Sequence, residues 1–203
     1  VVKDDGRPES ARAFPAANRP VPDPSSTQFS NEAARDEAGE ARKVMDWAAI
    51  EPGMTVADIG AGEGYYTVRL AVRVGTKGRV LAQDINPGAL ERLGQRIDRE
   101  RLDNVSIKAG AIDDPNLPDA SFDRVFMVHM FHEVTEPYAM LWRLRPALNK
   151  GGQVIVVDRD LPGSQHGLDP KILFCEFEAT GYRLLEFAEQ PTVGGYCARF
   201  EAT

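Results

Sequence analysis

The sequence predicts an α/β fold in which a mostly parallel sheet is covered by helices on both faces. Short, almost wholly apolar runs, typical of buried parallel strands, alternate with segments of helical periodicity. This alternation indicates five βα units. Two final apolar segments flank the turn-forming residues 191–195 and therefore predict an antiparallel hairpin.

Length and composition fit one domain with a full core. The chain has 203 residues, of which 42% are hydrophobic. No run approaches the roughly 18 consecutive apolar residues of a membrane span, so no membrane-spanning segment is expected. The formal net charge of −7 argues against a nucleic-acid partner, because phosphate backbones require a basic face. Cys175 and Cys197 are too few for a disulfide scaffold or a cysteine-based zinc site.

Residues 1–30 are expected to form an arm outside the domain, because prolines recur there among small and polar residues. The arm is predicted to be flexible or to lie on the surface; the alternative is a lid, with Phe14 or Phe29 over the ligand cleft. Residues 31–203 then make a single domain. The composition predicts a cytoplasmic protein, with export as the alternative if a signal peptide preceded Val1.

The first element expected in the domain is a helix over residues 31–49. Alanines recur there at helical spacing, and Met45 continues the same face. Ser30 or Asn31 can cap the start of this helix, and Pro52 lies beyond its end.

The remaining elements follow from apolar runs and helix signals. Asn86 before Pro87 is a favourable helix start, and Thr135 is the expected cap of a helix that Gly151 terminates. The strands are expected at 54–59, 79–85, 105–109, 122–128 and 153–157, the helices after residues 64 and 86 and over 136–149 and 170–180, and the hairpin strands at 182–187 and 196–200.

A turn with three glycines separates the first strand from the next helix. Gly60, Gly62 and Gly64 let the chain turn sharply and let backbone N–H groups approach a nucleotide-like ligand. Asp58, just before them, can hold the turn or accept from a cationic ligand. Dinucleotide sites use G-x-G-x-x-G. Tyr65 stands where their third glycine would be, which disfavours a nicotinamide-dependent oxidoreductase.

The second strand ends in a carboxylate about twenty residues after the glycines. Asp84 at that position can accept hydrogen bonds from both hydroxyls of a ribose. Together with the glycine turn, it predicts a site for a ligand that contains a nucleoside.

Four ordered motifs resemble those of class I S-adenosylmethionine-dependent methyltransferases, over about residues 31–203. They are Asp58-x-Gly60-x-Gly62-x-Gly64, Asp84 at the end of the second strand, the Leu-Pro-Asp-Ala-Ser-Phe-Asp stretch at 117–123 and the Leu-Asn-Lys-Gly-Gly stretch at 148–152. The resemblance implies a Rossmann-like, seven-stranded sheet of order 3-2-1-4-5-7-6 with strand 7 antiparallel, which agrees with the terminal hairpin. It also implies S-adenosylmethionine as the cofactor.

The resemblance further implies which residues bind this cofactor. They are Asp58, Gly60, Ala61, Gly62, Gly64, Tyr65, Asp84, Ile85, Ala111, Ile112, Asp113 and His129. One position departs from the family, which usually carries Gly-Asp after strand 3 to receive the adenine amino group; here the pair is Gly110-Ala111. Either Asp113 or Asp114 replaces this acid, or the backbone of Ala111 and Ile112 holds the adenine.

Methyl transfer needs an aligned, water-free approach of the acceptor, and a base only where the acceptor carries a proton. The segment after the strand at 122–128 lies where a base would stand. His129 is the first candidate for a base or substrate contact, against a purely structural role. His132 is the second, although beside Glu133 its expected role is to orient the loop. No metal site is expected from these three, because they share one segment without an evident distant ligand.

The predicted function is a methyltransferase acting on a small molecule by in-line transfer. No insertion separates the last two strands, so the site accepts a small substrate or is completed by a second subunit in a homodimer. The alternative is a catalytically inactive module that binds S-adenosylmethionine or a partner, motivated by Ala111 and the lack of a clear base. His166, in the loop 158–168, is expected to be a plain surface residue although the topology brings it near the site.

Overall fold

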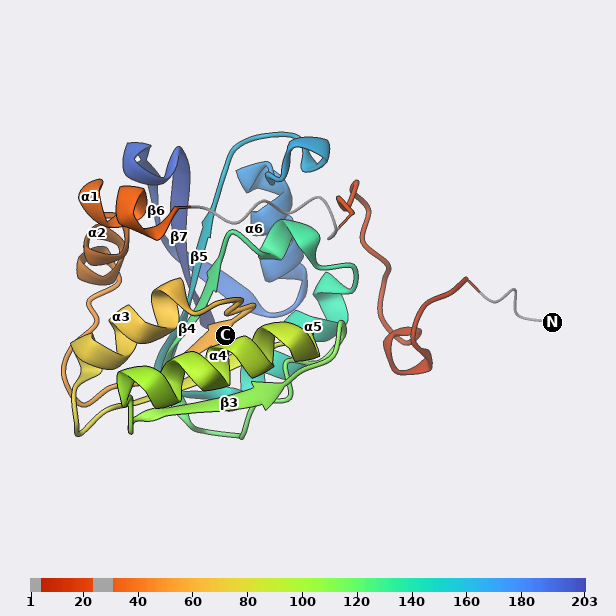
Figure 1. The fold of residues 1–203 in the computed structure, drawn as a ribbon. Coiled ribbons are helices and arrows are strands. Elements are labelled where there is room, and N and C mark those ends of the chain that lie inside the picture. Colours follow the sequence, from red (N-terminus) through yellow and green to blue (C-terminus); the bar gives the residue numbers. More distant parts are fainter. Residues whose placement is uncertain (1–4, 24–30) are drawn as a thin grey trace.

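The computed structural model describes residues 5–23 and 31–203. A seven-stranded sheet of order β3-β2-β1-β4-β5-β7-β6 runs through the domain (Figure 1). Its strands are β1 (Thr55–Ile59), β2 (Arg79–Asp84), β3 (Val105–Ala109), β4 (Phe122–Val128), β5 (Leu148–Asp158), β6 (Tyr182–Gln190) and β7 (Gly195–Ala202). Strand β7 pairs antiparallel with β5 and β6, and the other pairings are parallel. The predicted fold class and strand order are confirmed.

Helices cover both faces of the sheet. They are α1 (Glu32–Glu37), α2 (Glu40–Trp47), α3 (Tyr65–Val74), α4 (Pro87–Glu100), α5 (Pro137–Leu144) and α6 (Pro170–Ala179). Helices α2 and α3 pack in one apolar cluster with Val56, whereas α5 and α6 pack in another with Ala57 (Figure 1). These neighbours in β1 belong to different clusters because successive side chains of a strand point to opposite faces.

The helix expected over residues 31–49 is two helices, α1 and α2. Gly39 between them has φ +70°, a left-handed conformation that takes the backbone out of the helical path. The cap prediction for Asn31 is confirmed, since its side chain accepts from the N–H groups of Ala33 and Ala34. Ser30, the other candidate cap, lies outside the described residues.

The helix expected over 136–149 is shorter than predicted. Helix α5 ends at Leu144, a 3-10 turn follows at Arg145–Ala147, and β5 already begins at Leu148. Pro146 explains the difference, because proline has no N–H for an α-helical hydrogen bond and clashes with the preceding turn. The apolar face at helical spacing therefore continued past the true end of the helix.

Two further details differ from the sequence prediction. Glu136, not Thr135, occupies the N-cap position of α5. Strands β3 and β4 are joined by residues 110–121, all within the described part, and these contain no helix. The alternation of strands and helices therefore has one gap, which leaves the loop after β3 free to approach the glycine turn.

Residues 5–23 lie along the domain. Arg7 donates to both carboxylate oxygens of Glu136, at 2.9 and 2.7 Å. Phe14, a candidate lid residue, lies 5.3 Å from the guanidinium of Arg143 in α5. Phe29, the other candidate, lies outside the described residues. These contacts agree with a surface arm, and the division into an arm and one domain stays a prediction.

Arg19 anchors the arm to the loop after β4. Its side chain is only 2% exposed, and its guanidinium donates to the carboxylate of Glu176 in α6 at 2.9 Å. The same guanidinium donates to the backbone carbonyls of Phe131, His132 and Val134 at 3.1–3.2 Å. One arginine thereby fixes the 3-10 turn Phe131–Glu133 and the residue after it, in the loop that carries two candidate site residues.

We expect Arg19→Ala to destabilise the protein by about 3–5 kcal/mol, because it leaves the buried Glu176 carboxylate without its partner. Urea unfolding measures this free energy. The double variant Arg19→Ala/Glu176→Gln should recover part of the loss. Arg12→Ala, in an exposed part of the arm, is the matched control and should cost no more than about 1 kcal/mol. Equal, small losses in Arg19→Ala and Arg12→Ala would contradict the anchoring role.

Candidate functional site

The glycine turn is packed between two neighbouring segments. A Cβ atom at Gly60 would lie 2.9 Å from the Met130 side chain, and one at Gly64 would lie 2.5 Å from Cδ1 of Leu93 in α4. Both glycines also have a positive φ, +67° and +91°. Close approach and backbone conformation therefore both require glycine here.

The structure brings Asp84 and the glycine turn together. One carboxylate oxygen of Asp84 accepts from the N–H of Gly62 at 2.9 Å, and the other accepts from the N–H of Asn86 at 2.9 Å. Ala61 donates its N–H to the carbonyl of Gln83, also at 2.9 Å. Ile85 follows Asp84 and is 53% exposed. These residues form one continuous cradle at the carboxyl ends of β1 and β2.

Asp58 lies beneath the turn and is 3% exposed. Thr67 in α3 donates its hydroxyl to the Asp58 carboxylate at 2.6 Å. Burial raises the pKa of Asp58 to about 7, with a contribution from the negative charge of Asp84, while the Thr67 hydrogen bond opposes the shift. Of the two uses predicted for Asp58, this contact supports holding the start of α3 against β1.

Tyr65, another predicted cofactor contact, directs its side chain toward α1. Its hydroxyl donates to Asp36 at 3.0 Å. The guanidiniums of Arg35 and Arg69 lie 3.7 and 3.9 Å from the centre of its ring. The ring therefore joins α1 to α3, and a cofactor contact through the Tyr65 backbone stays a prediction.

Asp113 holds the arm against α5. Its carboxylate accepts from the Ser10 hydroxyl of the arm and from the Arg143 guanidinium of α5, and the residue is only 4% exposed. Burial raises its pKa, but the hydrogen bonds from Ser10 and Arg143 outweigh burial and hold the pKa below its usual value. A contact of the Asp113 carboxylate with the cofactor stays a prediction.

The other candidates after β3 form a tight turn. The N–H of Ala111 donates to the Asp114 carbonyl at 2.8 Å, and the Asp114 carboxylate accepts from the N–H of Asn116 at 2.8 Å. Ile112 between them is 41% exposed. A contact of adenine with Ala111 or Ile112 stays a prediction.

Gln83 is a residue that the sequence reasoning missed. It is 2% exposed, accepts from the Gly60 N–H at 3.4 Å and donates to the Pro115 carbonyl at 3.3 Å. A Cβ at Gly110 would lie 1.6 Å from its amide nitrogen, so glycine is required there. Gln83 thus links the glycine turn to the loop after β3. The signal in the sequence that could have identified Gln83 is a side-chain amide directly after the apolar residues 80–82 of β2.

His129 directly follows β4 and lies beside a buried carboxylate. Its Nε2 is 3.7 Å from Glu40 in α2, and Arg35 donates to both Glu40 oxygens at 2.8 and 2.6 Å. Although burial raises the pKa of Glu40, the bonds from Arg35 and His129 lower it to about 2. Glu40 is therefore an anion that directs the His129 ring. Sequence periodicity missed it because the break at Gly39 changes which residues face inward.

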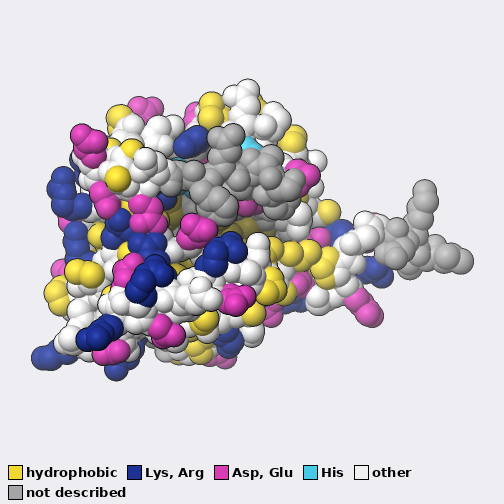
Figure 2. Space-filling view, in the orientation of Figure 1, with side chains coloured by type: hydrophobic (Ala, Val, Ile, Leu, Met, Phe, Trp, Pro, Cys, Tyr) yellow, Lys and Arg dark blue, Asp and Glu magenta, His cyan; other side chains and the backbone are white. Residues whose placement is uncertain are grey.

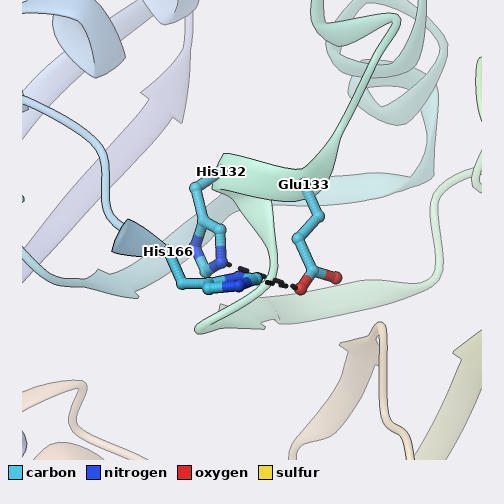
Figure 3. Close-up of side chains that lie close together, drawn as sticks. All are labelled: His132, Glu133 and His166. Carbon is cyan, nitrogen blue, oxygen red and sulfur yellow. Dashed lines mark ion pairs between the residues drawn. The ribbon is translucent and has the colours of Figure 1, made fainter. Parts of the chain in front are cut away.

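His132 is held by a carboxylate from a different strand. Its Nδ1 lies 3.0 Å from both oxygens of Asp158, the last residue of β5, which is fully buried. Its Nε2 lies 3.8 Å from Oε1 of Glu133, and Nδ1 of His166 lies 3.7 Å from the same oxygen (Figure 3). No distant ligand was expected near His132 and Glu133, and that expectation is wrong, since His166 comes from the loop after β5.

The strand order, the glycine turn and the acid after β2 together define a class I S-adenosylmethionine-dependent methyltransferase. A family model described as a methyltransferase domain matches residues 50–179. The chain belongs to this family, whose cofactor is S-adenosylmethionine.

Curated relatives are similar over part of their length. The chain is 30% identical over 155 residues to the ubiquinone/menaquinone biosynthesis C-methyltransferase UbiE of Shewanella sp. (strain ANA-3), covering 75% of this chain and 57% of that protein. The UbiE protein of Shewanella frigidimarina (strain NCIMB 400) is 30% identical over 133 residues, which are 64% of this chain and 52% of that one. The chain thus spans about half the length of the curated relatives it matches.

Solved structures share the fold. A S-adenosylmethionine-dependent methyltransferase from Aquifex aeolicus has a TM-score of 0.72 at 24% identity, covering 86% of this chain and 98% of that one. The [4+2]-cyclase SpnF has a TM-score of 0.68 at 15% identity, covering 95% of this chain and 90% of that one. Because one of these is described as a cyclase, the fold by itself does not specify the reaction.

We expect Asp58→Asn to flatten the dependence of stability on pH. The native pKa of about 7 lies above the ordinary 3.8, so the native state binds the proton more tightly. The free energy of unfolding should therefore fall as pH rises from about 4 to about 7, and the asparagine should remove this contribution. Urea unfolding across this range measures the slope. The exposed Asp103→Asn is the control and should keep the wild-type slope; an unchanged slope in Asp58→Asn would refute the assignment.

Proposed function

We propose that this chain transfers a methyl group from S-adenosylmethionine to a small-molecule acceptor. The observation that carries the proposal is the contact of the Asp84 carboxylate with the N–H of Gly62, 2.9 Å apart. This contact puts a hydrogen-bond acceptor and a glycine turn around one space at the carboxyl ends of adjacent parallel strands, where ligands of such sheets bind.

The described residues fit an adenosyl group. Each oxygen of Asp84 accepts one backbone N–H, from Gly62 and Asn86. A carboxylate has roughly four lone-pair positions, so capacity remains for two ribose hydroxyls. A Cβ atom at Gly62 would meet no atom within 4 Å, so this glycine leaves open space beside its backbone, which supports a close approach of the ligand.

When bound, S-adenosylmethionine supplies a methyl group whose bond to the sulfonium breaks, with its electron pair passing to sulfur, as the acceptor forms the new bond. The protein has to hold the acceptor in line and exclude water. Met130 packs against Gly60, so the loop after β4 closes one side of the turn with an apolar side chain. This loop is therefore the proposed border between the cofactor and the acceptor.

His129 is the proposed general base when the molecule that receives the methyl group carries a proton. Its Nε2 faces the Glu40 anion at 3.7 Å, which favours a hydrogen on that nitrogen. Nδ1 is then the atom that takes the proton from the acceptor. The backbone of His129 is fixed by its N–H, which donates to the Val157 carbonyl at 2.8 Å, so the ring is positioned before the acceptor binds.

A small acceptor is supported by the size of the segments around the site. The loop after β4 spans residues 129–136, the loop after β5 spans residues 159–169, and β6 follows α6 through a single glycine turn at Gly181. The matched relatives are named for ubiquinone/menaquinone biosynthesis, which also agrees with a small-molecule acceptor. Since the chain spans about half of those proteins, we propose the class of acceptor only.

A ligand-binding module without catalysis is the second candidate function. Ala111 in place of the acid that the family usually carries motivates it. One assay distinguishes the two functions, because only a methyltransferase transfers a radiolabelled methyl group from S-adenosylmethionine to a member of a metabolite panel.

The surface charges bear on whether the protein binds nucleic acid. Acidic and basic side chains are interspersed over the face shown in Figure 2, and the net charge is −7, which together disfavour a phosphate backbone as partner. No helix among the described residues is long and apolar enough to cross a bilayer. A homodimer and a cytoplasmic location stay predictions.

We expect Asp84→Asn to weaken the binding of S-adenosylmethionine and S-adenosylhomocysteine by about 1.5–3 kcal/mol, the value of a hydrogen bond to a charged group. Asparagine keeps an acceptor for the backbone, so the turn should stay folded. Calorimetry measures the affinities, with Asp103→Asn as a control that should bind like the wild type. Absence of binding to the wild type at millimolar ligand would refute the cofactor site.

We expect His129→Ala to lower kcat roughly 10²–10⁴-fold for acceptors that are protonated at the assay pH, which is the usual contribution of a general base. The measurement is radiolabelled methyl transfer to a panel of phenols, thiols and amines. Acceptors whose pKa lies below the assay pH should be nearly unaffected, because they need no base. An equal loss for both kinds of acceptor would contradict the base role and indicate a structural one.

A further inference from the structure

Three side chains able to ligate a metal converge at the carboxyl ends of β4 and β5 (Figure 3). His132 and Glu133 come from the 3-10 turn Phe131–Glu133, and His166 comes from the loop after β5. One ligand atom from each lies within 4.8 Å of the others. We propose that these three residues bind a divalent first-row transition-metal ion, for which Zn²⁺ is the test ion.

The separations of the ligand atoms are close to those of a bound ion. Two ligands about 2.1 Å from one zinc ion with tetrahedral angles lie about 3.4 Å apart. Oε1 of Glu133 lies 3.8 Å from His132 Nε2 and 3.7 Å from His166 Nδ1. The ligand atoms of His132 and His166 lie within 4.8 Å of each other, so side-chain rotation has to bring these two closer when an ion binds.

Asp158 fixes which nitrogen of His132 is available. A carboxylate only accepts hydrogen bonds, so the Nδ1 atom of His132, 3.0 Å from both Asp158 oxygens, carries a hydrogen. In the neutral imidazole the Nε2 atom then has a bare lone pair, and it faces Glu133. A lone pair and a carboxylate oxygen repel unless a positive charge lies between them. The carboxylate–histidine arrangement is also the one that orients histidine ligands in metal sites.

A second proton on His132 is the competing source of that positive charge. An imidazolium between Asp158 and Glu133 would satisfy both carboxylates without a metal. A metal ion would in addition use His166, whose Nδ1 approaches the same Glu133 oxygen at 3.7 Å, and the binding test below distinguishes the two explanations. His166 also has φ +55°, an uncommon conformation for a residue with a side chain, and such outliers concentrate at functional sites.

The backbone of this cluster is positioned before any ion binds. Arg19 donates to the carbonyls of Phe131 and His132 at 3.1 Å, and the N–H of Glu133 donates to the Met130 carbonyl at 2.9 Å. A rigid turn lowers the entropy lost when its side chains are ordered around an ion. The arm thereby contributes to the site although it supplies no ligand.

The ligand set also indicates which ions fit and what the site can do. Two imidazoles and one carboxylate suit zinc, cobalt, nickel or iron(II) rather than magnesium or calcium, which prefer oxygen. Three protein ligands leave a position for water or a donor atom of another molecule, as in catalytic rather than structural zinc sites. That this donor belongs to the methyl acceptor rests on the proposed function; metal binding itself does not.

The test measures Zn²⁺ binding to the untagged full chain after treatment with a chelator, by calorimetry and by competition with a chromogenic chelator. The wild type should bind one Zn²⁺ per chain, in preference to Mg²⁺, and Co²⁺ should give the visible absorption of a nitrogen-ligated site. Asp158→Asn should weaken Zn²⁺ binding about 10–100-fold, as loss of a group that orients a histidine ligand does. Glu133→Gln and His166→Ala, which remove ligands, should weaken it more.

His129→Ala is the matched control, because it removes a histidine from the same segment but outside the cluster, and it should bind Zn²⁺ like the wild type. Circular dichroism verifies that each variant folds. Glu133 and His166 are partly exposed, so their variants remove a ligand outside the apolar core. Failure of the wild type to bind one Zn²⁺, or equal loss in His129→Ala and His166→Ala, would overturn the proposal. These assays contain no S-adenosylmethionine, so their outcome is separate from that of methyl transfer.

Discussion

The parallel pairing of β1, β2, β4 and β5 is the constraint on which the candidate site depends. Parallel strands end at the same edge of the sheet, so residues that follow different strands meet although the sequence separates them. Asp84 at the end of β2 reaches Gly62 after β1, and His132 after β4 reaches Asp158 at the end of β5. The pairing of the strands therefore fixes the positions of polar groups at their ends and just beyond them.

Buried carboxylates around this edge are stable because each has a specific partner. Glu40 has Arg35, and the pKa of Glu40 is lowered to about 2. Glu176 has Arg19, which opposes burial, although burial still raises the pKa of Glu176. Asp58 accepts from the uncharged hydroxyl of Thr67, and burial raises its pKa to about 7. The protein therefore disfavours the charged form of the carboxyl group beneath the glycine turn.

The sequence predicted what depends on local pattern and missed what depends on distant partners. Apolar runs located the strands, and Asn31 as a helix cap needed only its immediate neighbours. The break at Gly39 and the early end of α5 at Pro146 were visible as residue types, but helical periodicity continued across them. The contact of Asp113 with Arg143 was not predicted, because the two residues lie thirty positions apart and no local pattern encodes their pairing.

His129 and His132 illustrate why the roles of the site residues needed the structure. They are the same residue type three positions apart, and the sequence ranked His129 before His132 as a base without indicating which ring nitrogen of either is available. The carboxylate of Glu40 faces Nε2 of His129, whereas that of Asp158 faces Nδ1 of His132. In each ring, the nitrogen that faces the carboxylate carries the hydrogen, so the other nitrogen keeps its lone pair. The lone pair is on Nδ1 in His129 and on Nε2, which is directed at Glu133, in His132. The carboxylates from α2 and β5 thus allow one histidine to accept a proton and its neighbour to bind a metal ion in the same site.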